Sequence, residues 1–136
     1  MTRFREALMT YLLAVPGLTA LVGDRIHYHK LPQNSLLPAV VILGVSDVKL
    51  HDLRGQLKLE QPVLQLSAQA VTQAAALAVA DQLKTALCDY HGTLSGLVVQ
   101  KMQLVSESES LDSTPDGLVQ VETVDLEFEI SFNKEV

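Results

Sequence analysis

Two histidines stand two residues apart in a short segment that the sequence predicts to be a strand. His27 and His29 would therefore project from the same face of that strand and could both bind a metal ion. His51 or His91 could supply a third ligand, but these spacings match no recognised metal site. We interpret the pair as surface or edge-strand residues. A small metal-binding protein or enzyme that uses His27 and His29 is the alternative.

The lone cysteine lies close to another histidine, near the expected end of a helix. Cys88 and His91 are three residues apart, so that a thiol and an imidazole could meet on one helix face. A cysteine nucleophile also needs a third group that orients the base, and the sequence indicates none. A cysteine at the end of an apolar helical stripe is more typical of a small core residue. A single thiol cannot form an internal disulfide, so nothing here indicates an oxidising compartment.

Three carboxylates alternate with apolar residues near the end of the chain. Asp125, Glu127 and Glu129 could perform acid–base chemistry or bind a cation. On a strand, however, this alternation is typical of one face in the core and one face in water or in an interface. The sequence contains no phosphate-binding glycine loop and no nucleophile elbow. We therefore predict a protein that is not an enzyme and that uses no metal and no cofactor.

Composition and charge narrow the classes of function. The chain has 136 residues, of which 48% are hydrophobic and 19% are charged, as expected for one globular domain spanning residues 1–136. Its net charge is −6, and nine of its sixteen acidic residues lie between positions 101 and 136. This balance argues against sequence-independent binding to nucleic acid. The acidic end could serve as a soluble surface or as a contact for a partner.

The N-terminal region has some features of a secretory signal. Arg3 and Arg5 precede a mostly apolar stretch that runs to Gly23, but Glu6 stands at its edge and Pro16-Gly17 interrupts it. Its apolar residues instead recur at helical spacing on one face. No other stretch is long enough to span a bilayer. We therefore predict a helix here, synthesis in the cytoplasm and no membrane partner.

Periodicity in the rest of the chain predicts an α+β fold. Long strands follow one another without intervening helices, which favours an antiparallel (mixed) β-sheet with two main α-helices packed on one face. Thr72 is expected to cap the second helix, and Gly23 and Gly92 are expected to end helical segments. The predicted helices span residues 3–15 and 73–89 with one short turn at 18–22, and the predicted strands span residues 25–29, 39–48, 57–70, 96–105 and 118–132.

Two strands carry apolar residues in both phases. Leu59 and Leu64 cannot share one face of a regular strand, and we place a bulge or bend between them at Gln61-Pro62, since proline cannot donate to a ladder. The last strand shows a similar change between Val121 and Val124. Three polar segments are predicted to be loops and docking segments, namely Leu31–Leu37, His51–Gly55 and Ser106–Gly117.

A series of short motifs runs along the chain in a fixed order. It comprises the Val15–Ile26 run with Pro16, Leu18, Val22-Gly23 and Arg25-Ile26, then Pro32-Gln33, Leu37–Val41, an alanine-rich helix, the Gly92-Thr93-Leu94 turn, an acidic loop and a closing strand. In this order the chain resembles the small tail-completion proteins of long-tailed bacteriophages and prophages, also called tail terminators or head-to-tail joining proteins. The resemblance covers nearly all 136 residues. His27-Tyr28-His29 departs from the family pattern.

The resemblance implies a structural protein of the virion, located at the tail or neck after synthesis in the cytoplasm of the host bacterium. It implies a hexameric ring that ends growth of the tail tube and docks to the head. The implied partners are further copies of the chain, the tail-tube protein and the head connector or head-completion protein. No sequence-specific contact with nucleic acid is expected, although DNA would pass through the ring. A bacterial adaptor unrelated to phage is a further alternative.

Candidate interface residues follow from the resemblance and from the polar segments. Arg25 occupies the family-like Val-Gly-x-Arg-Ile position and is a candidate polar contact between neighbouring copies. We also hypothesise that the acidic C-terminal strand or the Ser106–Gly117 segment lines the central opening, where negative charge would keep DNA from sticking. The full set comprises Arg25, Gln33, Asn34, Asp52, Arg54, Glu107, Glu109, Asp112, Asp116, Glu127 and Glu129.

Overall fold

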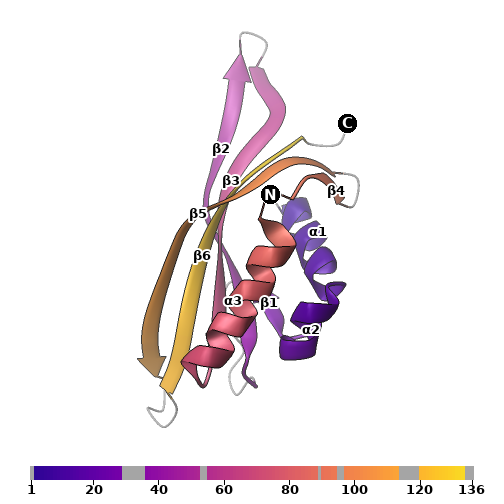
Figure 1. The fold of residues 1–136 in the computed structure, drawn as a ribbon. Coiled ribbons are helices and arrows are strands. Elements are labelled where there is room, and N and C mark those ends of the chain that lie inside the picture. Colours follow the sequence, from indigo (N-terminus) through magenta and orange to yellow (C-terminus); the bar gives the residue numbers. More distant parts are fainter. Residues whose placement is uncertain are drawn as a thin grey trace.

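The computed structural model describes residues 2–28, 36–52, 55–88, 90–94, 97–113 and 120–133. These residues form an α+β arrangement of helices packed against one curled sheet (Figure 1). The elements in chain order are α1 (Thr2–Leu13), α2 (Pro16–Val22), β1 (Ile26–Tyr28), β2 (Ala39–Asp52), β3 (Gly55–Ala70), α3 (Gln73–Leu87), β4 (Gly92–Leu94), β5 (Leu97–Ser113) and β6 (Gln120–Asn133).

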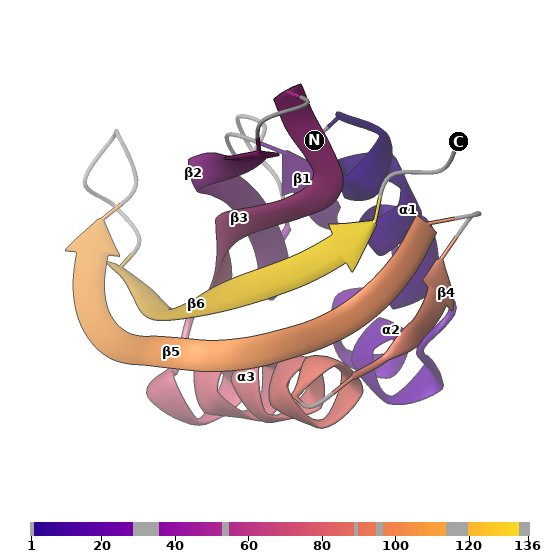
Figure 2. The same cartoon turned by 90° about the horizontal axis from the view of Figure 1, so that it is seen from above.

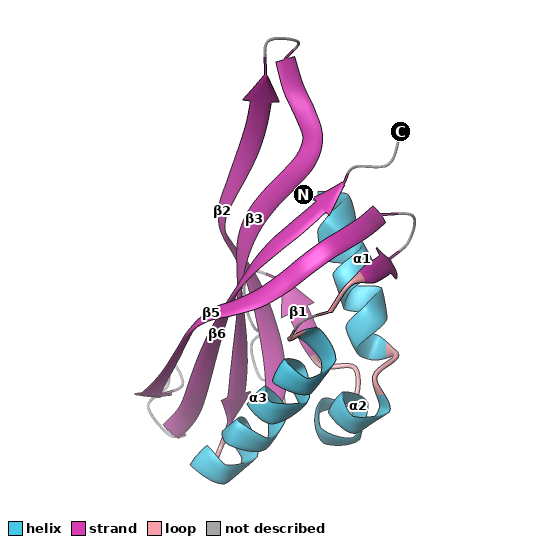
Figure 3. Ribbon diagram, turned by 45° about the horizontal axis from the view of Figure 1, so that its top comes forward, coloured by secondary structure: helices cyan, strands magenta, loops and turns pink. Residues whose placement is uncertain are grey.

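The sheet is mixed, as the sequence predicts. Its strand order is β1-β2-β3-β6-β5-β4, with β1 parallel to β2 and the other neighbouring strands antiparallel. Seen from above, the sheet curls strongly, and α1 and α2 lie beside α3 (Figure 2), which packs mainly on β3 and β6. All three helices gather on one face, which we call the helix face (Figure 3). The opposite side of the sheet is called the second face below.

The N-terminal helices follow the predicted apolar stripe. Phe4, Leu8 and Leu12 are fully buried at intervals of four residues on α1. Pro16 begins α2, where its missing amide hydrogen costs no helical hydrogen bond. Gly23 ends α2 with a φ of +62°, and its N–H donates to the Thr19 carbonyl over 2.8 Å. This confirms the predicted break and the predicted short turn.

Helix α3 begins as predicted but ends earlier. The Thr72 hydroxyl accepts a hydrogen bond from the Ala75 N–H over 3.2 Å, which confirms the predicted cap. The helix stops at Leu87 because Cys88 is already extended, so the prediction that Gly92 ends it is wrong. The Tyr11 hydroxyl donates to the carbonyl of Ala86 over 2.9 Å and satisfies one of the last helical acceptors. Gly92 instead opens β4 with a φ of +147°.

The core lies between the helix face of the sheet and the three helices. Phe4 stacks on Phe132 with ring centroids 4.6 Å apart and an interplanar angle of 14°, which joins α1 to β6. The buried stripe of α3 packs on the centre of the sheet and consists of Ala76, Val79, Ala80, Leu83 and Leu87. The facing strands contribute Val40, Ile42, Leu64, Leu66, Ala68, Val124, Leu126, Phe128, Ile130 and Phe132.

The prediction of a loop at Ser106–Gly117 is wrong for its first eight residues. Strand β5 continues to Ser113 and pairs with β6 in one unbroken register from Ser106↔Glu127 to Ser113↔Gln120. Its side chains from Ser106 to Leu111 are all exposed. Because both faces of this part of β5 are exposed, its sequence is mostly polar and shows no apolar alternation. Its backbone hydrogen bonds to β6 hold it as a strand all the same. Residues 114–117 lie outside the described part.

The predicted turn at His51–Gly55 is also too long. Strand β2 runs to Asp52 and β3 begins at Gly55, with His51↔Gln56 and Asp52↔Gly55 as the last pairs. Only positions 53 and 54 separate the strands, and they lie outside the described residues. The β2–β3 hairpin thereby extends beyond the helices as an arm (Figure 1).

Of the bulge or bend expected at Gln61-Pro62, the bulge is wrong for β3 in its ladder with β6. Strand β3 keeps one register with β6 from Glu60↔Phe132 to Leu64↔Phe128, although Gln61 and Pro62 have no partner in that ladder. The register changes on β2 instead, where Val45 is the extra residue between Gly44 and Ser46. Because β3 keeps this register from Leu59 to Leu64, position 59 falls on the second face and position 64 on the helix face. A second register shift with β2 lies between Lys49 and His51, where β3 has more unpaired residues than β2.

The change of phase in the last strand has a different origin. Val121 and Thr123 are buried on the second face, at 8% and 7% exposure, whereas Val124 is buried on the helix face. The bulges in this part of the sheet belong to β5, where register shifts occur between Val99 and Lys101 and between Leu104 and Ser106. Burial on both faces of β6 thus produces the mixed pattern.

In the residues that the structure describes, no single helix is long and apolar enough to cross a membrane. The helical segments Phe4–Leu13 and Pro16–Val22 together have the length and apolar composition of a membrane span, but a bend of 85° separates them.

Candidate assembly surface

Three of the predicted acidic residues share the second face of the sheet. Asp125, Glu127 and Glu129 alternate on β6 with buried core residues, as the sequence predicts. Their neighbours on β3 are Ser67, Gln65 and Val63, in that order. Because alternate residues of one strand are spaced about 6.5–7 Å apart, the three carboxylates form a row along the sheet.

The first carboxylate of this row is held by its neighbours. The Ser67 hydroxyl, which is 5% exposed, donates a short hydrogen bond to Oδ1 of Asp125. The Gln65 side-chain amide in turn donates to Ser67 Oγ over 3.3 Å. This polar chain fixes Asp125, whereas Glu127 is half-buried and Glu129 is exposed. Glu127 and Glu129 are therefore the members of the row that are better placed to meet a partner.

The other acidic candidates on β5 divide between the two faces. Glu107 and Glu109 stand opposite Leu126 and Val124, which places them on the helix face. Asp112 stands opposite Val121, at a position of the second face, and its side chain is not described. The sequence groups these residues as one acidic segment, but a strand projects alternate residues to opposite sides.

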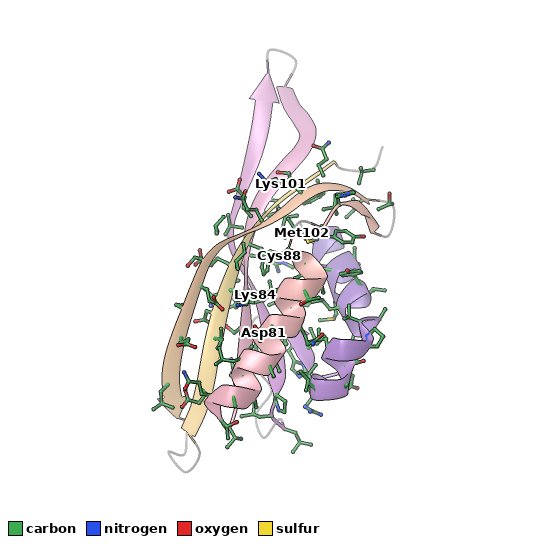
Figure 4. All side chains as sticks on the ribbon, in the orientation of Figure 1. Asp81, Lys84, Cys88, Lys101 and Met102 are labelled. Atoms are coloured by element: carbon green, nitrogen blue, oxygen red, sulfur yellow. The ribbon has the colours of Figure 1, made fainter. Side chains whose placement is uncertain are left out.

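Glu107 makes a contact within the chain. Its carboxylate lies 2.7 Å from the ammonium of Lys84 on α3, and Asp81 lies 3.7 Å from the same nitrogen. Asp81 and Lys84 follow one another along α3 in Figure 4. The hydrogen bond from Lys84 to Glu107 is the main cause of the raised pKa of Lys84. The pair thus ties α3 to the part of β5 that the sequence predicts to be a loop.

Removing this pair should have a small effect that depends on pH. Both side chains are about one-third exposed, at 30% and 38%, so a double-mutant cycle of Lys84→Met and Glu107→Gln should give a coupling of about 0.5 kcal/mol at pH 7. A raised pKa in the folded state means that this stabilisation is complete below the ordinary value of 10.5 and is lost as the pH rises through the folded value. Urea titrations from pH 7 to pH 11.5 measure it.

The matched control for that cycle is the neighbouring pair. Asp81 is 70% exposed and 3.7 Å away, so the cycle of Lys84→Met with Asp81→Asn should give a smaller coupling. Equal coupling energies for the two pairs would contradict the assignment of Glu107 as the main partner of Lys84. A Glu107 coupling energy that grows above pH 10.5 would contradict it as well.

Arg25 also has a structural contact within the chain. Its Nε donates to the Pro38 carbonyl over 2.9 Å, and its own carbonyl accepts from the Val40 N–H over 2.9 Å. The side chain is half-buried. Arg25 thereby joins the start of β1 to the start of β2, and a contact with a neighbouring copy remains a prediction.

The remaining candidates are only partly placed. Asp52 is the last residue of β2, and its side chain is not described. Four residues lie outside the described part of the chain, namely Gln33, Asn34, Arg54 and Asp116.

The histidine alternative finds no ligand set among the described residues. His27 is half-buried on β1, its Nε2 makes no hydrogen bond within the described structure, and His29 lies outside it. The next residue, Tyr28, packs its ring 6.0 Å from the guanidinium of Arg5, and burial raises its pKa to about 12. Among the described residues, no three or more histidines, cysteines or acids gather as a metal site. Cys88 is exposed at the end of α3.

Two backbone edges of the sheet are features that the sequence analysis does not identify. Strand β4 covers only Leu97–Val99 of β5, and β1 covers only Val40–Ile42 of β2. Among the described strands, the rest of β5 and the rest of β2 each pair on one side only. No local signal reveals the first edge, because the alternation Ser-Glu-Ser-Glu-Ser at 106–110 is polar at every position and lacks the apolar–polar alternation of a half-buried strand.

Comparisons with known proteins give one family and one shared fold. The model of the family described as "Tail completion protein gp17" matches residues 6–131. A search of curated proteins gives no significant match. Among solved structures, a chain from the "Virion of native gene transfer agent (GTA) particle" matches with a TM-score of 0.64 and 20% sequence identity. The match covers 95% of this chain and 93% of that chain, and at this identity it establishes the shared fold alone.

Proposed function

Because the chain belongs to the tail completion protein gp17 family, whose members are structural and not enzymatic, we propose that it caps the tail tube of a phage-like particle. In this proposal a closed ring of copies ends the tube and forms the surface that docks to the head connector. The family match over residues 6–131 is the observation that carries the proposal.

The geometry suits an assembly protein of this kind. The helices cover one face of the sheet, and the β2–β3 arm extends beyond them (Figure 1). Among the described strands, β5 beyond β4 and β2 beyond β1 are each paired on one side only and can meet a neighbour. Contacts between two unlike surfaces close into a ring after a fixed number of copies. Segments that extend from a rigid sheet can order on a partner, here the tail-tube protein or the head connector.

Deletion of the gene from the cells that make the particle tests this function. We expect DNA-filled heads and unattached tails in electron micrographs, and loss of DNA delivery to recipient cells. Wild-type protein supplied from a plasmid should restore joined particles, and a labelled copy should lie at the neck. Six copies of the 14.8-kDa chain would form a ring of about 89 kDa. Joined, functional particles without the protein, or a label elsewhere on the particle, would refute the proposal.

A further inference from the structure

The free edge of β5 contains a regular stretch that can accept another strand. From Ser106 to Ser113 it pairs with β6 without a register shift, and the stretch contains no proline. Its side chains from Val105 to Leu111 are exposed, including the apolar Leu111 at 56% and the bulge residue Val105 at 48%. An edge with regular backbone donors and acceptors is a template for strand addition.

The free edge of β2 lies at the other side of the same sheet. It begins at Leu43, where the ladder with β1 has ended, and continues to Asp52 in the arm. The arm extends past the helix layer in two views (Figures 1 and 3), so its backbone can reach another molecule. The chain therefore offers two long edges of different sequence and position.

Charge disfavours pairing of two β5 edges with one another. In a two-fold antiparallel pair centred on Ser108, Glu107 of one copy would stand opposite Glu109 of the other, and like charges opposite one another destabilise strand pairs. The segment 43–52 of β2 is nearly neutral, with Asp47 and Asp52 against Lys49. An acidic edge therefore meets less repulsion on the β2 edge of a second copy than on itself.

We propose that the Ser106–Ser113 edge of one copy pairs with the Leu43–Asp52 edge of the next copy, so that the sheet continues across the subunit boundary. This inference rests on the proposed function, because it names the contact that builds the ring. The two surfaces differ, so each added copy leaves one edge of each kind exposed until the ring closes. The neighbour covers the exposed Val105 and Leu111 of the β5 side.

Proline substitution at the β5 edge tests the pairing. Amides of consecutive strand residues point to opposite sides, so one of Ser108 and Glu109 has its N–H directed at β6 and the other at the free edge. We expect the inward variant of Ser108→Pro and Glu109→Pro to lose stability. The outward variant should keep the wild-type melting temperature within a few degrees and should be lost from purified tails, because proline removes a donor only from the edge.

Thermal melting identifies which variant is outward, so the result does not depend on assigning the amides beforehand. If the stable variant is incorporated into tails as well as the wild type, the edge pairing is refuted while the proposed ring stands. If the wild-type protein itself is absent from tails, the proposed function fails first.

Cross-linking distinguishes pairing of unlike edges from pairing of like edges. In a Cys88→Ser background, a chain carrying both Ser46→Cys and Ser108→Cys is incorporated into tails and treated with a short bis-maleimide. Unlike edges predict a ladder of products that ends at the size of the ring, and neither single cysteine should give products. A control chain with Ser46→Cys and Asp81→Cys, the latter on the exposed side of α3, should give none. Dimers from Ser108→Cys alone, or no ladder from the double variant, would overturn the proposal.

Discussion

Replacing Phe132 by alanine is expected to lower the free energy of unfolding by about 3–5 kcal/mol. The side chain is 1% exposed and stacks on Phe4, so its removal leaves a cavity where β6 meets α1. A domain of this size has about 5–15 kcal/mol of stability in total, and the variant should therefore melt roughly 10 °C or more below the wild type. Urea unfolding at 25 °C and thermal melting measure the two quantities.

The matched variants separate the cavity from the aromatic contact. Phe132→Leu keeps most of the volume and should cost less than the alanine variant. A cycle that combines Phe132→Ala with Phe4→Ala should show a coupling of about 0.5–1.5 kcal/mol for the ring pair. A loss below about 1 kcal/mol for Phe132→Ala would show that this end of β6 does not belong to the core.

The elements that bury one face are those that the sequence predicts well. The stripe of Phe4, Leu8 and Leu12 and the stripe of α3 recur at helical spacing because each helix has one apolar side. The alternation from Val124 to Phe132 predicts the core half of β6 for the corresponding reason. In these segments, the apolar residues that recur in the sequence are the residues that the fold buries.

The elements that the sequence does not predict are held mainly by backbone pairing. Ser106–Ser113 is polar on both faces, and only its register with β6 makes it a strand. The ends of β2 and β3 near Asp52 and Gly55 are likewise strands through their pairing with each other, where the sequence predicts a turn. Pairing depends on the partner strand, which a local pattern does not contain, so exposed strands resemble loops in sequence.

The candidate site is predicted in part for a similar reason. The alternation at Asp125, Glu127 and Glu129 correctly places these residues together on one face, because a strand has a period of two. The links from Arg25 to Pro38 and from Lys84 to Glu107 join segments that are distant in sequence, and no local signal indicates them. The two free edges emerge only from the strand order.

Edge-to-edge pairing and the acidic row support one arrangement of the proposed ring. If sheets continue from copy to copy, all helix faces point to one side of the wall and all second faces to the other. The curled sheet carries Glu127 and Glu129 on the second face, away from the helix layer. We propose that this second face lines the opening. Repeated carboxylates would then repel the phosphates of passing DNA.

Reversal of these two charges should impede DNA delivery. The variant Glu127→Lys with Glu129→Lys changes the net charge of each chain from −6 to −2 and would place a row of ammonium groups in the opening. Each lysine that contacts a phosphate adds an attraction that weakens as salt rises. We expect rings and joined particles to form, and DNA delivery to fall by about tenfold or more at low ionic strength, with recovery in added salt. Release of labelled DNA from purified particles measures the effect.

The control reverses the same amount of charge on the helix layer. Glu6→Lys with Asp81→Lys also gives a net charge of −2, and both residues are exposed on α1 and α3. Because the helices would face outward, this variant should release DNA at the wild-type rate. Equal release by both variants would exclude the second face as the lining. Slower release by the control alone would place the helix layer there instead, since the attraction requires the lysines to lie within about 10 Å of the passing phosphates.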